Sequence, residues 1–281
     1  MKFWKMVAVT GLSLAVLAAG CGTDSGKQKT DGTEDTWIEG IGPTNPVDRV
    51  PVYPEDDGSQ YELTVTTVEE TDEAKDGETV YFQSSLRYPM FEGVYGDNLN
   101  RIVAEIAEEF RAYLPEAKDN AAWDYADAMS YEYSGLRLPE AEELTVSFVW
   151  SKEQIAVLKA EYYSNSGGAH PNVCYKTYVV DMMYGTEMTP EQALSSYGVT
   201  AGDIVSYAAE KIREEHGEDL LETDEESYLE TQLQFFLENR QWYLKETGLV
   251  LLANPYDIAP YAYGVIECEI PYEVLEQGLK K

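Results

Sequence analysis

Residues 248–275 read GLVLLANPYDIAPYAYGVIECEIPYEVL, and the rest of the chain is predicted to pack around this stretch. The apolar run at 249–253 is typical of a buried strand. Apolar and acidic side chains alternate at 266–270, which predicts a second strand with one face toward the core. Asn-Pro and a second proline interrupt residues 254–264, so this tyrosine-rich segment is expected to form a loop between the strands.

Upstream of this stretch, the hydrophobic pattern alternates between a period of two and a period of about 3.6 residues. The strongest helical pattern runs over residues 97–114, where Asp97 is expected to cap the start and Pro115 to end the helix. Thr200 and Asp203 have the spacing of a capping box at the start of another helix. The other predicted elements are helices at 121–129, at 200–216 and after Glu226, and strands at 61–68, 78–88, 144–150, 155–163, 173–181 and 241–245. This order predicts an α+β fold with largely antiparallel sheets, amphipathic helices packed on them and two intimately associated subdomains.

The net charge of the chain limits the kinds of partner that it can bind. Its 281 residues include 52 Asp and Glu against 20 Lys and Arg, a formal net charge of −32. Such a field repels nucleic acid and anionic headgroups and attracts cationic partners, so nucleic acid is excluded as a ligand. A strongly solvated surface also accounts for the charge. The 22 tyrosines and 44% hydrophobic content indicate a folded chain, because acidic disordered chains are poor in aromatic residues.

The N-terminus resembles an export signal. Residues 1–21 read MKFWKMVAVTGLSLAVLAAGC, with two lysines, a short apolar segment and small residues before Cys21. The last four residues resemble a bacterial lipobox, which implies that Cys21 is lipidated and becomes the first mature residue. An ordinary cleaved signal, or an anchor helix with an incidental cysteine, is the other interpretation. Residues 22–60 are predicted to form a flexible acidic tether, so the protein is expected to be exported and anchored by lipid in the bilayer, on the outer face of the bacterial cell membrane.

Three short segments that contain glycine or tyrosine carry a family resemblance. The segments 166–170 (SGGAH), 255–264 (PYDIAPYAYG) and 270–272 (IPY) resemble the extracytoplasmic module of RsiV-type, lysozyme-sensing anti-sigma factors. The same type of module forms the non-catalytic N-terminal part of PdaC-type peptidoglycan deacetylases. The resemblance implies a PdaC-module-like subdomain at residues 61–175 and an RsiV-ectodomain-like subdomain at 176–277.

This resemblance implies a binding module and not an enzyme. The described activity of such ectodomains is binding lysozyme. The cytoplasmic sigma-binding segment and transmembrane helix of the anti-sigma factors are not recognised in this sequence, and neither is the metal-dependent catalytic domain of the deacetylases. A lysozyme-like cationic muramidase is therefore the expected partner. A cell-wall glycan, recognised by the tyrosine-rich loops, is the alternative.

The candidate binding loops combine residues that favour turns with tyrosines, which have an apolar ring and a polar hydroxyl. His170 either binds a ligand or hydrogen-bonds its own turn, and the structural role is favoured because one histidine has no positioned partner in the sequence. The tyrosines either stack on sugars, contact a protein partner or pack the edge of the sheet. The candidate residues are Gly167, Gly168, His170, Asn172, Asn254, Tyr256, Asp257, Tyr261 and Tyr263.

Other kinds of site find little support in the sequence. With Cys21 lipidated, Cys174 and Cys268 form an even pair in an exported protein, which permits a disulfide but does not require it. The chain has two histidines, so a histidine-rich metal site is not expected, and no cofactor motif is present. No nucleophile with its base, and no placed pair of carboxylates, is recognised. An enzyme of another type is therefore the third and least favoured hypothesis.

Overall fold

The computed structural model describes residues 63–131, 138–217, 219–221 and 227–279. The predicted signal peptide, Cys21 and the predicted tether lie outside these residues. The strands are β1 (Thr64–Asp76), β2 (Thr79–Glu92), β3 (Glu140–Lys152), β4 (Ile155–Asn165), β5 (Asn172–Asp181), β6 (Thr186–Glu187), β7 (Trp242–Lys245), β8 (Gly248–Ala253) and β9 (Ile266–Pro271). The helices are α1 (Gly96–Ser130), α2 (Pro190–Ala193), α3 (Ala201–His216), α4 (Tyr228–Glu238) and α5 (Tyr272–Glu276).

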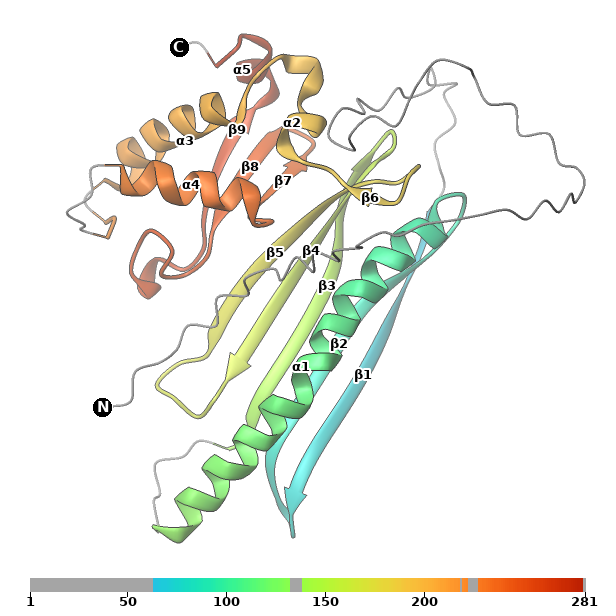
Figure 1. Ribbon diagram of the computed structural model, residues 1–281, viewed down its shortest axis with the longest axis vertical. Helices are drawn as coiled ribbons and strands as arrows, with labels where there is room; N and C mark the ends of the chain where they lie inside the picture. Colours follow the sequence, from blue (N-terminus) through green and yellow to red (C-terminus); the bar gives the residue numbers. More distant parts are fainter. Residues whose placement is uncertain (1–62, 132–137, 218, 222–226, 280–281) are drawn as a thin grey trace, which may run out of the picture. The chain divides into compact units, whose positions relative to one another are not determined.

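The strands form two sheets, and the predicted α+β fold with largely antiparallel pairing is confirmed (Figure 1). One sheet has the order β1-β2-β3-β4-β5-β6, and the other has the order β7-β8-β9. Among the described strands, only β2 and β3 pair in parallel, and α1 lies between them in the chain. None of the helices in the described residues is both long and apolar enough to cross a membrane.

Helix α1 covers one face of the six-stranded sheet, as its apolar stripe predicts (Figure 1). Its buried residues Leu99, Val103 and Ile106 pack with Leu144 of β3 and Leu158 of β4. Burial of side chains of this size contributes roughly 1.5–3 kcal/mol each. This stripe is the core of the first half of the described chain.

The predicted end of this helix at Pro115 is wrong, because α1 continues to Ser130 and includes the short helix predicted at 121–129. The proline is exposed, so water can bond the carbonyl that its missing N–H leaves free. Beyond it, Ala117 and Ala121 pack in a small core, and Lys118 pairs with Asp72 at 2.8 Å. The expected cap is also displaced by two residues, because Tyr95 holds the N-cap position and Asp97 lies in the first turn.

Strands β1 and β2 are longer than the sequence pattern predicts. Pairing continues beyond residue 68, where the first strand was expected to end, and the chain reverses at Gly77, which has φ 60°. The second strand was expected to end at residue 88, yet Pro89 pairs opposite Thr67. Strand β3 pairs with β2 only up to Arg87, so the missing N–H of Pro89 interrupts no β2–β3 ladder.

The second sheet contains β8 and β9, the two strands predicted on either side of the tyrosine-rich loop. All six residues of β8 are buried between its neighbours, and Ile266, Cys268 and Ile270 of β9 are buried in alternation. Helices α3 and α4 contribute to the same core, and α3 begins with the predicted capping box of Thr200 and Asp203. Gly248 is required where β8 meets β9, because an added Cβ would lie 2.2 Å from the carbonyl oxygen of Ile270.

Strand β5 joins the two sheets. The backbone N–H of Thr177 donates to the carbonyl of Arg240 at 2.7 Å, and its hydroxyl also donates to Trp242 of β7. Val157 and Val179 from the six-stranded sheet belong to the core of the three-stranded sheet. Residue 175, where one subdomain was expected to end, lies inside β5.

Candidate functional site

The two predicted loops lie side by side. Residues 165–172 connect β4 to β5, and residues 253–266 connect β8 to β9. The ring of His170 stacks on Tyr261 at a centroid distance of 4.0 Å and an angle of 19°. Tyr256 lies 5.4 Å from Tyr261 and 6.3 Å from His170 between ring centroids. We call these three side chains, His170, Tyr256 and Tyr261, the aromatic cluster.

Hydrogen bonds fix the rings of the aromatic cluster relative to one another. The Tyr261 hydroxyl donates to the carbonyl of Pro171 at 2.9 Å. Nδ1 of His170 lies 3.0 Å from the same carbonyl, a contact that requires a proton on Nδ1. In the neutral ring, Nε2 is then the acceptor for the Tyr256 hydroxyl, 3.4 Å away. His170 therefore hydrogen-bonds within its own loop and is also exposed beside both tyrosines.

Tyr256 lies at the tip of a strained turn. Residues 254–257 form a type II turn, in which Pro255 takes the second position and the Asp257 N–H donates to the Asn254 carbonyl at 3.0 Å. The third position needs a positive φ and usually holds glycine, but Tyr256 adopts φ 74° there. This backbone conformation costs a side-chain-bearing residue about 1–2 kcal/mol. The ring is nevertheless 52% exposed, so little burial offsets the strain.

A buried polar network holds this turn in place. Asn254, 8% exposed, accepts from the N–H of Tyr175 at 2.6 Å and donates to its carbonyl at 3.2 Å. The Asp257 carboxylate accepts from the Asn254 N–H at 2.7 Å and from Gln241 at 2.6 Å. Burial raises the pKa of Asp257, and these two hydrogen bonds oppose the rise. The Tyr228 hydroxyl also donates to the Asp257 carbonyl at 3.0 Å.

The predicted loop residues therefore have different roles. Asn254 and Asp257 are anchors beneath the turn and do not form its exposed surface. Gly167 provides the positive φ of 72° in its loop, and Asn172 pairs with Ser164 at the start of β5. Tyr263 lies outside the aromatic cluster and donates its hydroxyl to Asp219. Gly168 is exposed in the loop beside His170.

Sequence reasoning missed the residues that support the turn from other elements. Gln241 and Tyr228 hold Asp257, and the backbone of Tyr175 holds Asn254. The spacing of Asn-Pro-Tyr-Asp is a recognisable signal of a turn with proline at its second position. No local pattern indicates which distant strand the asparagine side chain reaches.

The disulfide that the sequence permitted between Cys174 and Cys268 is not formed, and both thiols are free. Cys174 lies on the face of β5 that carries Tyr178, which packs in the core under α1. Cys268 lies on the face of β9 that packs in the core with α3. Lys159 and Glu267 lie on the other faces of the two sheets, and they pair with each other at 3.4 Å. The two sheets therefore contact each other through the faces that do not carry the cysteines, and the two thiols point away from each other. Burial raises the pKa of Cys268 to about 11, which disfavours a reactive thiolate.

Three carboxyl groups lie close together where α1 meets β3: Asp124 on α1, and Glu140 and Glu142 on β3. Glu140 is 6% exposed, and its Oε1 has no hydrogen-bond partner among the described residues. Burial, together with the nearby charges of Asp124 and Glu142, raises the pKa of Glu140 to about 7. Glu142 accepts from Ser164 at 2.8 Å and Tyr113 at 3.3 Å. Across the described part of the chain, no group of three or more His, Cys, Asp or Glu is placed to hold a metal ion.

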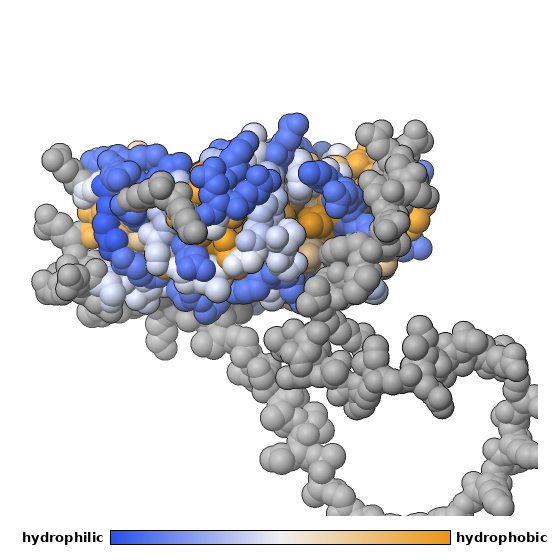
Figure 2. Space-filling model, turned by 90° about the horizontal axis from the view of Figure 1, so that it is seen from above, coloured by the Kyte–Doolittle hydropathy of each residue, from blue (hydrophilic) through white to orange (hydrophobic). Residues whose placement is uncertain are grey.

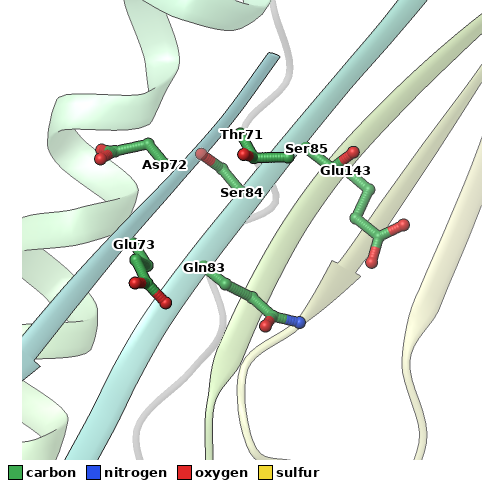
Figure 3. A pocket seen from close by; sticks show the side chains of 7 residues that line it. All are labelled: Thr71, Asp72, Glu73, Gln83, Ser84, Ser85 and Glu143. Carbon is green, nitrogen blue, oxygen red and sulfur yellow. The ribbon is translucent and has the colours of Figure 1, made fainter. Parts of the chain in front are cut away.

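A polar groove lies over β1, β2 and β3 (Figure 3). It has a volume of about 460 Å³, and no aromatic residue lines it. Its lining residues are Thr71, Asp72, Glu73, Gln83, Ser84, Ser85 and Glu143. The aromatic cluster and this groove are separate surfaces, because no residue of the two loops lines the groove.

The fold and the loops define a two-part α+β module with an exposed aromatic surface. Residues 75–173 match the family model described as deacetylase PdaC, and residues 199–273 match the model described as DUF3298, a protein family of unknown function. The PdaC-like segment predicted from the sequence is thereby supported. Neither matched segment is a catalytic deacetylase domain, so the matches indicate a non-catalytic module.

Two solved structures are similar to this chain, and the first of them has the same fold. A DUF3298 family member from Bacteroides fragilis NCTC 9343 is 17% identical, with a TM-score of 0.52, over 78% of this chain and 93% of that chain. A DUF3298 family protein from Pseudomonas aeruginosa PAO1 is 16% identical, with a TM-score of 0.42, over 77% and 93%. The comparison with curated protein sequences gave no match.

Proposed function

We propose that this protein is a non-catalytic binding lipoprotein of the bacterial cell envelope that captures a cationic muramidase such as lysozyme through the aromatic cluster. One observation carries the proposal. Tyr256 occupies a turn position that favours glycine, its ring is half exposed, and a buried network enforces the conformation. Strain held in this way at an exposed side chain is typical of ligand contacts.

Electrostatics and the resemblance to RsiV-type ectodomains support the muramidase as partner. Muramidases of this kind are cationic, and a net charge of −32 attracts them over a long range. The face of the protein seen in Figure 2 is largely hydrophilic, with smaller hydrophobic patches. The tyrosine rings of the aromatic cluster supply the short-range contact area that charge alone lacks.

Calorimetric titration of the full chain with lysozyme at low salt tests the proposal. Binding is expected, and the double change Tyr256→Ala and Tyr261→Ala is expected to weaken it by at least about tenfold, which is the range for central aromatic contacts. Tyr184→Ala is the matched control, because Tyr184 is 55% exposed in the turn that follows β5, while the candidate loop precedes that strand. Absence of binding at low salt contradicts the lysozyme proposal.

The aromatic cluster also supports a second candidate function, recognition of peptidoglycan or another polysaccharide, because exposed tyrosine rings stack on sugars. Sedimentation with purified cell wall separates the two functions. Retention of the protein without lysozyme, lost in the Tyr256→Ala and Tyr261→Ala variant, favours the glycan.

Anchoring by lipid at Cys21 belongs to the same proposal and places the module on the outer face of the cell membrane. Its support is the lipobox-like sequence at the end of the signal. Metabolic labelling with palmitate is expected to mark the protein. The label should be absent from a Cys21→Ala variant, and a labelled variant contradicts the anchor.

A further inference from the structure

Strand β1 leaves a long edge of the six-stranded sheet open. It is the first strand in the sheet order, and within the described residues no strand pairs with its outer side (Figure 1). Eleven of its 13 residues are exposed. A strand of this length spans about 43 Å. Its outward N–H and C=O groups are therefore available to an additional strand.

The side chains of β1 divide between the two faces of the sheet. Glu70 and Asp72 point toward α1, where they pair with Arg111 at 2.6 Å and Lys118 at 2.8 Å. Thr71 and Glu73 alternate with them and pair in register with Ser85 and Gln83 of β2. These pairs lie on the face away from α1, and they line the polar groove (Figure 3).

The polar groove carries negative charge beside this open edge. Glu73 and Glu143 lie on β1 and β3, either side of the Thr71–Ser85 pair. Of the three carboxylates that line it, Glu73 and Glu143 lie on the groove side of the sheet, whereas Asp72 points toward α1, and no basic residue lines the groove. Glu73 is paired with Lys75 at 2.5 Å, but both side chains are about half exposed, so solvent screens that pair.

We propose that β1 is a docking edge for an extended, lysine- or arginine-rich segment of a partner protein. The segment adds as a further strand through main-chain hydrogen bonds and places a cationic side chain in the polar groove, between Glu73 and Glu143. A second copy of this chain does not fit the edge. β1 has five acidic residues and one basic residue, so self-pairing would bring like charges together.

Hydrogen exchange and calorimetry with two synthetic peptides test this proposal. The first is a 12-residue peptide of alternating Lys and Thr, and the second has the same charge but proline in place of every threonine. The first is expected to bind the full chain at least tenfold more tightly and to slow amide exchange within residues 64–76. Equal affinity for the two peptides, or slowed exchange only outside β1, overturns strand addition.

Variants of the groove test the role of charge. Glu73→Gln with Glu143→Gln is expected to weaken binding of the Lys-Thr peptide by about fivefold or more, the range for two charge contacts in a partly exposed site. Glu214→Gln with Glu273→Gln, exposed carboxylates on α3 and α5, is the control of equal charge change. Equal weakening by both pairs contradicts a local site. Tyr256→Ala should leave peptide binding unchanged, so this inference stands or falls independently of the aromatic cluster.

Discussion

Tyr256 links stability to binding at a single backbone position. Because its φ of 74° suits glycine, Tyr256→Gly is expected to unfold with a free energy about 1 kcal/mol greater than Tyr256→Ala, the reverse of the usual order of these two residues. Both changes remove the ring and should weaken ligand binding equally. Urea denaturation measures the first effect and calorimetry the second. A less stable glycine variant would show that the turn is not strained.

Glu140 makes stability depend on pH. Its pKa is raised to about 7 in the folded protein from an ordinary value of 4.5, so folding favours the protonated form. The stabilising contribution is complete below pH 4.5 and is lost as the pH rises through about 7. Glu140→Gln is therefore expected to exceed the wild type in unfolding free energy by about 2 kcal/mol at pH 8.

Denaturant titrations at several pH values check this expectation. The advantage of Glu140→Gln should disappear near pH 4, where both chains carry a neutral group at this position. Glu214→Gln on α3 is a control that removes an exposed carboxylate outside the group formed by Glu140, Glu142 and Asp124. If the control gains as much stability at pH 8, the general repulsion among acidic groups is the cause, and the buried carboxyl is not.

At the scale of elements, α1 carries a proline that its packing overrides. Pro115 removes one helical N–H and leaves a carbonyl near Arg111 without its partner. Pro115→Ala restores that hydrogen bond at an exposed site and is expected to raise the unfolding free energy by about 1–3 kcal/mol. Thermal denaturation followed by circular dichroism measures it. Destabilisation would mean that a bend at Pro115 is needed to seat Ala117 and Ala121 on the sheet.

The ends of helices and strands could be predicted where neighbouring residues determine them. They could not be predicted where contacts with distant parts of the chain determine them. The capping box of Thr200 and Asp203 is such a local signal and was correctly predicted. The part of α1 beyond Pro115 is supported by distant contacts, because Ala117 and Ala121 pack with Phe82 of β2 and Lys118 pairs with Asp72 of β1. The survival of β2 past Pro89 depends on where β3 stops pairing. A single sequence contains neither piece of information.

At the scale of the whole molecule, the candidate site shows the same difference between local sequence signals and distant contacts. The sequence identified both loops, because turn formers and tyrosines cluster in them. It could not separate the anchor Asn254 from the exposed Tyr256, since the separation depends on the hydrogen bonds of Asn254 to Tyr175. The absence of a disulfide between Cys174 and Cys268 has a similar origin. The sequence shows which side chains share one face of a strand, but it does not show which face of that strand contacts the other sheet.

The charge of the whole molecule and the contacts of the aromatic cluster should act on different rate constants. A net charge of −32 steers a cationic partner before contact, so the association rate constant with lysozyme is expected to fall by about tenfold or more between 20 and 300 mM NaCl. The tyrosine contacts form at short range, so Tyr256→Ala should act mainly by raising the dissociation rate constant. Stopped-flow measurements on both chains at each salt concentration separate these effects. If Tyr256→Ala slowed association and left dissociation unchanged, Tyr256 would act during the encounter and not in the bound complex, and the strained turn would have no role in holding the partner.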